Sequence, residues 1–452
     1  MKKIASILLA LVMALSLVAT AFAAEGDTYE IYQIFTGDYS DGVLSNVKWG
    51  QNGKGYSAEA NADLSVAEAI LTELTGVNSA EKTDKEKLAV IEKHADLTTK
   101  PYKTGTATTY EGLPNGYYLV KNVDGSQDGE NEFYTLFVVK VVDNNLEFSP
   151  KGSVPTVGKE VVDNDANIGD TVTFILTATM PSNIDEYDTY KVIFHDTLSS
   201  GLTYVSITSV VVNGKTLTAD DYTADHESGE LTVTIADVVK YDVTKDSTVV
   251  VTYTATLNSG AIIGSAGNPN TVYLEYSNNP NTGGEGDTGY TPPEEVKVYT
   301  WKIPVFKYTG TNTPLAGAGF TLYDEGVAVK LTKVGDSNVY KVDPNGTVTE
   351  ITTGSGGRFE IEGLEQGTYV LKETNTPAGY NTCDDVTVVI GANGTLTQDG
   401  DATTEVSIQN NAGTVLPETG GVGTTIFYIV GGILVLAAVV LLVTKKRMQN
   451  NG

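Results

Sequence analysis

The residue types that most often carry chemistry in proteins are scarce in this 452-residue sequence. Its one cysteine, Cys383, allows no disulfide within the chain. The three histidines, His94, His195 and His226, lie far apart, and no Cys/His group has the spacing of zinc ligands. No Ser/His/Asp or Cys/His constellation is evident either. The sequence therefore predicts no metal site, no cofactor and no enzyme active site.

Three segments between residues 305 and 410 carry a more specific pattern. They are Val305-Phe306-Lys307, Gly367-Thr368-Tyr369-Val370-Leu371-Lys372-Glu373-Thr374 and Val406-Ser407-Ile408-Gln409-Asn410. Together they resemble the collagen-binding-protein B-type repeat of sortase substrates, and the second segment matches the E-box of that family closely. The resemblance covers essentially the whole region 296–411.

That resemblance implies an internal isopeptide bond, formed when a lysine amine attacks an asparagine carboxamide and ammonia leaves. The reaction needs a neutral lysine, a polarised amide and near-contact geometry. Burial lowers the lysine pKa and keeps a nearby carboxyl group protonated, and folding supplies a high effective concentration. Carried over to this chain, Lys307 is the nucleophile, Asn410 the electrophile and Glu373 the proton relay.

A second region, 151–280, resembles the middle domain of Gram-positive shaft pilins. The resemblance rests on Pro155-Thr156-Val157-Gly158-Lys159, Phe194-His195-Asp196-Thr197-Leu198 and Leu274-Glu275-Tyr276-Ser277-Asn278-Asn279-Pro280. It implies a second isopeptide bond between Lys159 and Asn278, with Asp196 as the relay. The spacing leaves Asn279 as an alternative acceptor.

The first region, 24–150, carries a partial copy of the E-box. The run from Gly112 to Lys121 parallels the residues before Glu373, but Asn122 stands where the carboxylate is needed. We therefore expect no isopeptide bond in this region. Two bonds in all would remove about 34 Da from the chain, because each nucleophilic attack releases about 17 Da as ammonia.

The junction Leu146-Glu147-Phe148-Ser149-Pro150-Lys151-Gly152 lies where shaft pilins carry the pilin motif, usually Tyr-Pro-Lys-Asn. The resemblance implies that a pilus-specific sortase joins Lys151 to Thr419 of the next subunit. Ser149 and Gly152 depart from the motif, so an ordinary linker lysine beside Pro150 remains the alternative.

The two ends of the chain indicate export and anchoring. Residues 1–23 combine Lys2 and Lys3, an apolar run and Ala21-Phe22-Ala23, which is the pattern of a signal peptide. In the C-terminal segment 412–452, an apolar stretch at 426–443 predicts a transmembrane span with a basic tail. The motif before it is Leu416-Pro417-Glu418-Thr419-Gly420. This order resembles the cell-wall sorting signal, which implies sortase cleavage after Thr419 and attachment to peptidoglycan.

The elements that must position these residues are mainly β. Residues 24–150 mix strand patterns with apolar residues at helical spacing between 62 and 95, which favours an N-terminal α+β-leaning domain. Short Val/Thr/Tyr/Ile-rich runs separated by turn residues then predict two tandem immunoglobulin-like sandwiches of the collagen-binding-protein A/B type, at 151–280 and 296–411. Residues 281–295, rich in Gly, Pro, Asn and Thr, indicate a linker.

The composition restricts the classes of partner. A net charge of −28 repels nucleic acid and suits a soluble surface protein. The leading hypothesis is a structural shaft subunit of a covalent pilus, with pilus-specific and housekeeping sortases, identical subunits, peptidoglycan, accessory pilins and host surface ligands as partners. The alternative is a monomeric wall-anchored adhesin or ancillary pilin, which would share every feature except a functional Lys151.

Overall fold

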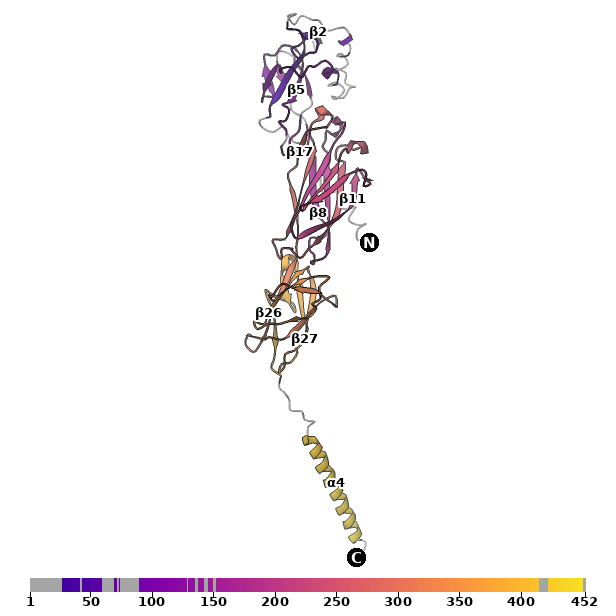
Figure 1. Ribbon diagram of the computed structural model, residues 1–452, viewed down its shortest axis with the longest axis vertical. Helices are drawn as coiled ribbons and strands as arrows, with labels where there is room; N and C mark the ends of the chain where they lie inside the picture. Colours follow the sequence, from indigo (N-terminus) through magenta and orange to yellow (C-terminus); the bar gives the residue numbers. More distant parts are fainter. Residues whose placement is uncertain are drawn as a thin grey trace. The chain divides into compact units, whose positions relative to one another are not determined.

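The computed structural model describes residues 27–40, 43–58, 69–70, 73, 89–127, 129–134, 137–141, 145–148, 152–413 and 422–449. Most of its elements are β-strands, so the prediction of a mainly β fold with immunoglobulin-like sandwiches is confirmed (Figure 1). The chain divides into two units, one of residues 1–301 with 363–366 and the other of 302–362 with 367–452.

The N-terminal sheet has the strand order β2-β1-β5-β6, with β3 also paired to β1. Alternate residues of its central strands enter two apolar clusters, so Leu119 packs on one face and Tyr118 on the other. Ile91, in a helical turn, packs in the same cluster as Phe35. The strands are β1 (Tyr29–Ser40), β2 (Val43–Trp49), β3 (Lys103–Gly105), β5 (Gly116–Asn122) and β6 (Phe137–Val141), beside the separate pair β4 (Thr109–Glu111) and β7 (Asn145–Glu147).

Two sheets form what we call the middle sandwich, residues 156–298. One has the order β13-β14-β10-β16-β17 with β18 on β16, and the other β12-β11-β15-β9-β8. Strict alternation of buried residues along β15 and β16 gives each sheet one core face. The strands are β8 (Thr156–Val161), β9 (Thr171–Thr179), β10 (Val192–Leu198), β11 (Leu202–Val212), β12 (Lys215–Thr216), β13 (Thr223–Glu227), β14 (Glu230–Ile235), β15 (Thr248–Leu257), β16 (Asn268–Ser277), β17 (Thr288–Tyr290) and β18 (Glu294–Val298), with 3-10 helices η1 (Ile184–Glu186), η2 (Val239–Tyr241) and η3 (Pro280–Thr282).

The segment 281–295, expected to be a linker, belongs instead to the middle sandwich. It contains β17 and the start of β18, and both strands pair antiparallel with β16. Both of its Pro residues, and its Gly residues other than Gly289 of β17, lie outside these short strands. Pairing with β16 satisfies backbone groups that would otherwise be exposed along an open sheet edge.

The C-terminal sandwich, residues 301–410, also has two sheets. Their orders are β20-β19-β26-β24-β23, with β31 on β19, and β22-β21-β27-β28-β29-β30, with β25 on β21. The last strand, β31, runs parallel to the first strand, β19. The strands are β19 (Trp301–Thr309), β20 (Thr313–Pro314), β21 (Gly319–Asp324), β22 (Val327–Ala328), β23 (Leu331–Lys333), β24 (Val339–Val342), β25 (Ile351–Thr352), β26 (Arg358–Leu364), β27 (Gly367–Asn375), β28 (Val386–Ile390), β29 (Leu396–Gln398), β30 (Asp401–Thr403) and β31 (Val406–Asn410), with the 3-10 helix η4 (Ala392–Gly394).

The long helix α4 (Val422–Gln449) follows near the C-terminal end (Figure 1). No helix in the part of the chain that the structure describes is long and apolar enough to cross a membrane. The prediction of a transmembrane span at 426–443 is therefore wrong. These 18 residues rise only about 27 Å as a helix, against about 30 Å for the hydrocarbon core of a bilayer.

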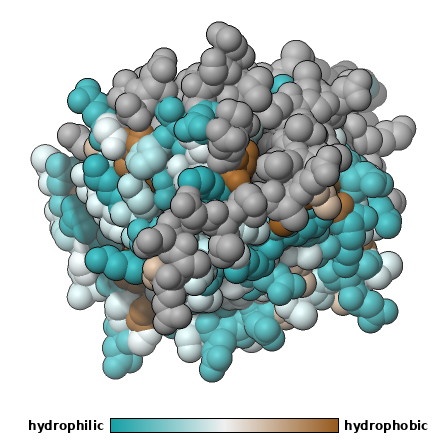
Figure 2. Space-filling model, turned by 90° about the horizontal axis from the view of Figure 1, so that it is seen from above, coloured by the Kyte–Doolittle hydropathy of each residue, from teal (hydrophilic) through white to brown (hydrophobic). Residues whose placement is uncertain are grey.

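The surface agrees with the acidic composition. On the face shown in Figure 2, the described residues are mostly hydrophilic, and hydrophobic residues are scattered among them. A net charge of −28 on such a surface favours solubility over association with other acidic polymers.

Candidate isopeptide sites

Lys307, Asn410 and Glu373 meet in the core of the C-terminal sandwich. Lys307 lies on β19 and Asn410 on the parallel neighbour β31, two residues beyond the direct partner of Lys307. Glu373 enters from β27 in the opposite sheet. The Lys307 amine and the Asn410 carboxamide therefore point inward from two paired strands and reach the same carboxyl group.

The contacts among these three side chains suit the predicted roles. Lys307 Nζ donates a hydrogen bond to Asn410 Oδ1. Asn410 Nδ2 donates to Glu373 Oε1 at 2.7 Å, and Lys307 Nζ lies 3.6 Å from the same oxygen. The side chains of Lys307 and Glu373 have no exposed surface. One carboxyl oxygen thus touches both the attacking amine and the nitrogen that would leave.

The surroundings of Lys307 favour its neutral form. Its amine lies 5.1 Å from the centroid of the Phe320 ring, within an apolar core. Loss of solvation lowers the pKa of Lys307, while attraction to Cys383 and Glu373 opposes that shift. A lowered pKa increases the share of neutral, nucleophilic amine.

Cys383 is a member of this cluster that the sequence did not reveal. Its backbone N–H donates to Glu373 Oε2 at 2.8 Å, and its half-buried thiol interacts with both Lys307 and Glu373. Burial raises the pKa of the Cys383 thiol to about 11, so the thiol stays protonated at neutral pH. A lone cysteine in a loop after the E-box carried no signal for this contact.

The middle sandwich holds a second buried pair, Lys159 on β8 and Asp196 on β10. Lys159 Nζ donates to Asp196 Oδ2, and neither side chain has exposed surface. Loss of solvation lowers the pKa of Lys159 to about 8, against the attraction of Asp196. Burial likewise raises the pKa of Asp196, and Lys159 opposes that shift. Burial therefore moves both groups toward their neutral forms.

Asn278, the expected partner of Lys159, lies elsewhere. Its Nδ2 donates to the carbonyl of Gln127, and its backbone carbonyl accepts the Tyr134 N–H at 2.8 Å, while its Oδ1 is buried without a hydrogen-bond partner. Asp196 is level with Val272 on β16, so Asn278 is six residues, about 20 Å, farther along the strand direction. The assignment of Asn278 as acceptor is corrected on this ground.

The alternative acceptor, Asn279, is also occupied away from the Lys159–Asp196 pair. Its Nδ2 donates to Asp287 Oδ2 at 2.7 Å, and its Oδ1 accepts the Asn281 N–H at 3.1 Å. Both contacts serve the turn around η3. The Asn278-Asn279-Pro280 segment thus forms a turn, although its two asparagines suggested an acceptor site.

Asn270, which the sequence analysis missed, is the carboxamide beside the pair. Its Nδ2 donates to Tyr253 Oη at 2.6 Å, and Tyr253 Oη donates to Asp196 Oδ1 at 3.1 Å. The Oδ1 of Asn270 is buried without a hydrogen-bond partner. The available signal was the phase of β16, since Asn270 alternates with the inward residues Val272 and Leu274.

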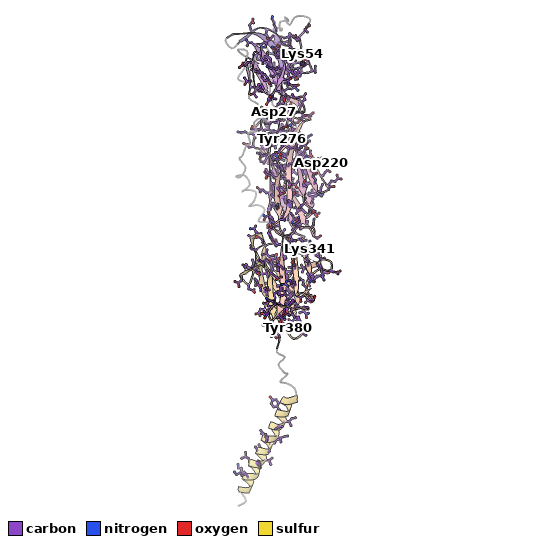
Figure 3. The ribbon with its side chains drawn as sticks, turned by 90° about the vertical axis from the view of Figure 1, so that its left-hand side faces the viewer. Asp27, Lys54, Asp220, Tyr276, Lys341 and Tyr380 are labelled. Carbon is purple, nitrogen blue, oxygen red and sulfur yellow. The ribbon has the colours of Figure 1, made fainter. Side chains whose placement is uncertain are left out.

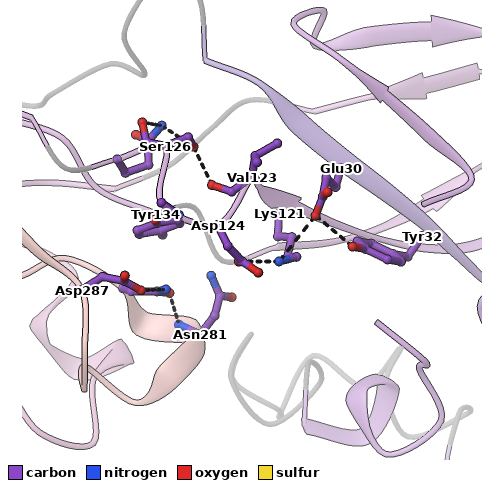
Figure 4. Close-up of polar contacts among 12 residues, drawn as sticks. Glu30, Tyr32, Lys121, Val123, Asp124, Ser126, Tyr134, Asn281 and Asp287 are labelled. Atoms are coloured by element: carbon purple, nitrogen blue, oxygen red, sulfur yellow. Dashed lines mark hydrogen bonds and ion pairs between the residues drawn. The ribbon is translucent and has the colours of Figure 1, made fainter. Parts of the chain in front are cut away.

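The N-terminal sheet offers no comparable lysine among its described residues. Lys121, the counterpart of Lys372, forms ion pairs with Asp124 at 2.5 Å and Glu30 at 3.5 Å near the surface (Figure 4). Asn122, the counterpart of Glu373, is buried. Of the lysines that the structure describes, Lys159 and Lys307 are the buried ones.

Several predicted residues lie outside the described part of the chain. These are the signal peptide, the acceptor Lys151 with Ser149 and Pro150, and the sorting motif Leu416, Pro417, Glu418, Thr419 and Gly420. Their roles stay predictions.

Family models match three stretches of the chain. Residues 160–280 match the Cna-B-like domain of Gram-positive pilin backbone subunit 2, residues 302–404 a prealbumin-like fold domain, and residues 408–450 the LPXTG cell wall anchor motif. The trypsin-resistant surface T6 protein of Streptococcus pyogenes serotype M6 is 28% identical over 298 residues. The chain is thus similar to Gram-positive backbone pilins over two of its domains and carries the match to a wall-anchor motif after them.

The match to the T6 protein covers 61% of this chain and 50% of the T6 protein, so the chain spans about half the length of that relative. Among solved structures, the T6 backbone pilin aligns with a TM-score of 0.52 at 21% identity, covering 81% of this chain and 78% of that one. The full-length major pilin SpaD of Corynebacterium diphtheriae aligns with a TM-score of 0.51 at 20% identity, covering 86% and 93%. These similarities concern the fold.

The anchor motif also gives the location of this chain. A wall-anchor match at residues 408–450, together with pilin domains, makes the chain a surface protein attached to the cell wall.

Proposed function

We propose that this protein is a backbone pilin, the repeating shaft subunit of a covalent pilus. The observation that carries the proposal is the match of residues 160–280 to a pilin backbone subunit domain. A pilus-specific sortase would cut after Thr419 and pass its carbonyl to Lys151 of the next subunit. A repeated head-to-tail linkage of this kind grows an open filament.

The proposal includes two internal bonds. Lys307 would join Asn410 with Glu373 as relay, and Lys159 would join Asn270 with Asp196 as relay. In each, the Nζ–Cγ bond forms, the Cγ–Nδ2 bond breaks and one ammonia leaves, a loss of about 17 Da. Each reaction occurs once per chain, so the pilin modifies itself and is not an enzyme.

The proposed partners follow from the two linkages. They are a pilus-specific sortase, identical subunits, a housekeeping sortase that transfers the finished filament to peptidoglycan, accessory pilins and host surface ligands. A monomeric wall-anchored adhesin is the competing function, and it needs no reactive Lys151.

An immunoblot of cell-wall digests in hot detergent tests the shaft function. Cells would carry the native chain, Lys151→Ala or the matched control Lys245→Ala, which removes an exposed lysine of the middle sandwich. We expect a high-mass ladder from the native and control chains and a single monomer band from Lys151→Ala. The ladder resists detergent and heat because its links are covalent.

Two other results would overturn the shaft function or the role of Lys151. A single band from all three chains would favour the monomeric adhesin. A ladder that survives Lys151→Ala would keep the shaft function but assign the linkage to a different lysine.

A further inference from the structure

The hydroxyl group of Tyr253 occupies a central position in the middle-sandwich site. Tyr253 lies on β15 directly opposite Phe174 on β9, has no exposed surface, and its ring stacks on Phe174 at 5.3 Å between centroids. Lys159 Nζ lies 5.8 Å from the Tyr253 ring centroid. The ring thus lines the pocket that holds the amine.

The Tyr253 hydroxyl joins two groups that do not bond to each other. Tyr253 Oη donates to Asp196 Oδ1 at 3.1 Å and accepts from Asn270 Nδ2 at 2.6 Å. Among the described residues, no hydrogen bond links Asp196 directly to Asn270. The register explains the gap, because Asn270 pairs with Leu198, two residues along β10 from Asp196. Such diagonal neighbours lie about 7–8 Å apart between Cα atoms, which is long for an aspartate side chain.

We infer that Tyr253 is a catalytic residue of the bond between Lys159 and Asn270, carrying a proton from Asp196 to the departing Asn270 nitrogen. This inference rests on the proposed Lys159–Asn270 bond and names the group that completes its proton path.

The proton balance of the step is closed. The neutral Lys159 amine attacks Cγ of Asn270. Tyr253 Oη gives its proton to Nδ2 of the tetrahedral intermediate and regains one from the carboxyl group of Asp196, which then accepts one proton from Nζ. Nδ2 then leaves as ammonia, and Asp196 and Tyr253 end in their starting protonation states.

The environment of Tyr253 fits a relay rather than a free base. Burial raises the pKa of Tyr253 well above its usual value, and the neighbouring Asp196 adds to the shift. The hydroxyl is therefore protonated at neutral pH and can donate when the nitrogen becomes a basic amine. A free phenolate would be costly in this core.

Tyr253→Phe tests the inference because it removes the hydroxyl and keeps the stacked ring. The matched control is Tyr276→Phe, since Tyr276, labelled in Figure 3, is also buried in the middle sandwich. Its hydroxyl donates to the Glu132 carbonyl at 3.1 Å and not to a relay group. The full chain is made by cell-free synthesis and quenched with acid over time. Tryptic peptides are then weighed to follow each crosslink separately.

We expect Tyr253→Phe to slow formation of the Lys159–Asn270 crosslink by about 100-fold or more, the usual size of a general acid–base contribution. The Lys307–Asn410 crosslink in the same molecules should form at the native rate, as should both crosslinks in Tyr276→Phe. A Tyr253→Phe chain that crosslinks Lys159 to Asn270 at the native rate overturns the role of Tyr253. A native chain without that crosslink overturns the proposed bond itself.

A second variant separates proton transfer from packing if Tyr253→Phe disturbs folding. 3,5-Difluorotyrosine at position 253 keeps the ring and the hydroxyl but makes the hydroxyl more acidic. We expect a changed rate of Lys159–Asn270 crosslinking with an unchanged rate for Lys307–Asn410. An unchanged rate at both sites would leave Tyr253 a packing residue only.

Discussion

The two sandwiches bury the same reactive groups in different geometries. In the C-terminal sandwich, Lys307 and Asn410 lie on adjacent strands of one sheet, and the relay Glu373 comes from the other sheet. In the middle sandwich, Lys159 lies on one sheet, while Asp196 and Asn270 lie on the other. A bond would therefore join neighbouring strands in the first case and two sheets in the second.

The carboxyl side chains differ in what they can reach. Glu373 contacts the carboxamide of Asn410 directly, at 2.7 Å. Asp196 is one methylene shorter and reaches Asn270 only through the Tyr253 hydroxyl. The difference teaches that the chemistry requires a proton path between amine and carboxamide, and that a shorter acid needs a second group to complete it.

Removing each acceptor asparagine in turn should have the largest effect on the stability of the two sandwiches. Asn410→Ala would open a crosslinked loop of 104 residues, and Asn270→Ala one of 112 residues. Loop-closure entropy for crosslinks of this length contributes about 4–5 kcal/mol to the free energy of unfolding, with loss of the buried partner adding to it. Calorimetry should show one lowered transition in each variant, and peptide masses should show loss of only the matching crosslink.

Asn258→Ala serves as a control for these variants, because the half-buried side chain of Asn258 bonds to Ser200, Thr203 and Gly260 and to none of the reactive groups. Its crosslinks should both remain. If Asn270→Ala retained the middle-sandwich crosslink, Asn278 or Asn279 would return as the acceptor, and the contrast between the two sites would fail.

The pH dependence of the unreacted middle site should be a smaller effect. In Asn270→Ala the Lys159 amine stays free, and its pKa in the folded chain is lowered from 10.5 to about 8. The unfolded chain then binds more protons than the folded chain above about pH 8, so the free energy of unfolding rises with pH from there toward 10. In the native chain the amine is consumed by the bond, and this rise should be absent.

Denaturant unfolding of Asn270→Ala and of the native chain at pH values from 7 to 9.5 measures the effect. Taking the difference between the two chains at each pH removes the contributions that they share, such as tyrosine ionisation. If the free energy of unfolding of Asn270→Ala stayed constant or fell relative to that of the native chain over this pH range, Lys159 would be charged in the folded state.

The sequence predicted the C-terminal site in detail because its residues are local to a recognisable pattern. Lys307, Glu373 and Asn410 each lie in a short matching segment, and the structure brings all three together. The mainly β fold followed from the same alternation of β-branched and polar residues. The sequence pattern and the structure agree here because the reactive residues occupy inward-facing positions in the alternation of their own strands.

The middle site was less accessible to sequence reasoning. The Asn-Asn-Pro segment has the composition of an acceptor region, but the register of β10 and β16 moves Asn278 away from Asp196. The register between β10 and β16 places Asn270 near Asp196. This register is set by packing and cannot be read from either strand alone. Tyr253 on β15 and Cys383 in a loop belong to these sites only through tertiary contacts.

Substituting Cys383 should have the smallest effect of these changes on crosslinking, and it tests whether the thiol takes part in the C-terminal site. The Glu373 carboxyl accepts the Cys383 backbone N–H, which Cys383→Ala retains, while only the thiol contacts to Lys307 and Glu373 are lost. We expect the Lys307–Asn410 crosslink to form completely, with a rate within about tenfold of the native one, since a neutral thiol adds little to a path that Glu373 already closes. Time-resolved peptide masses measure this rate, and the Lys159–Asn270 crosslink in the same chain is the internal control.

If Cys383→Ala abolished the Lys307–Asn410 crosslink alone, the thiol would be a required member of that proton path. Both sites would then depend on a fourth group.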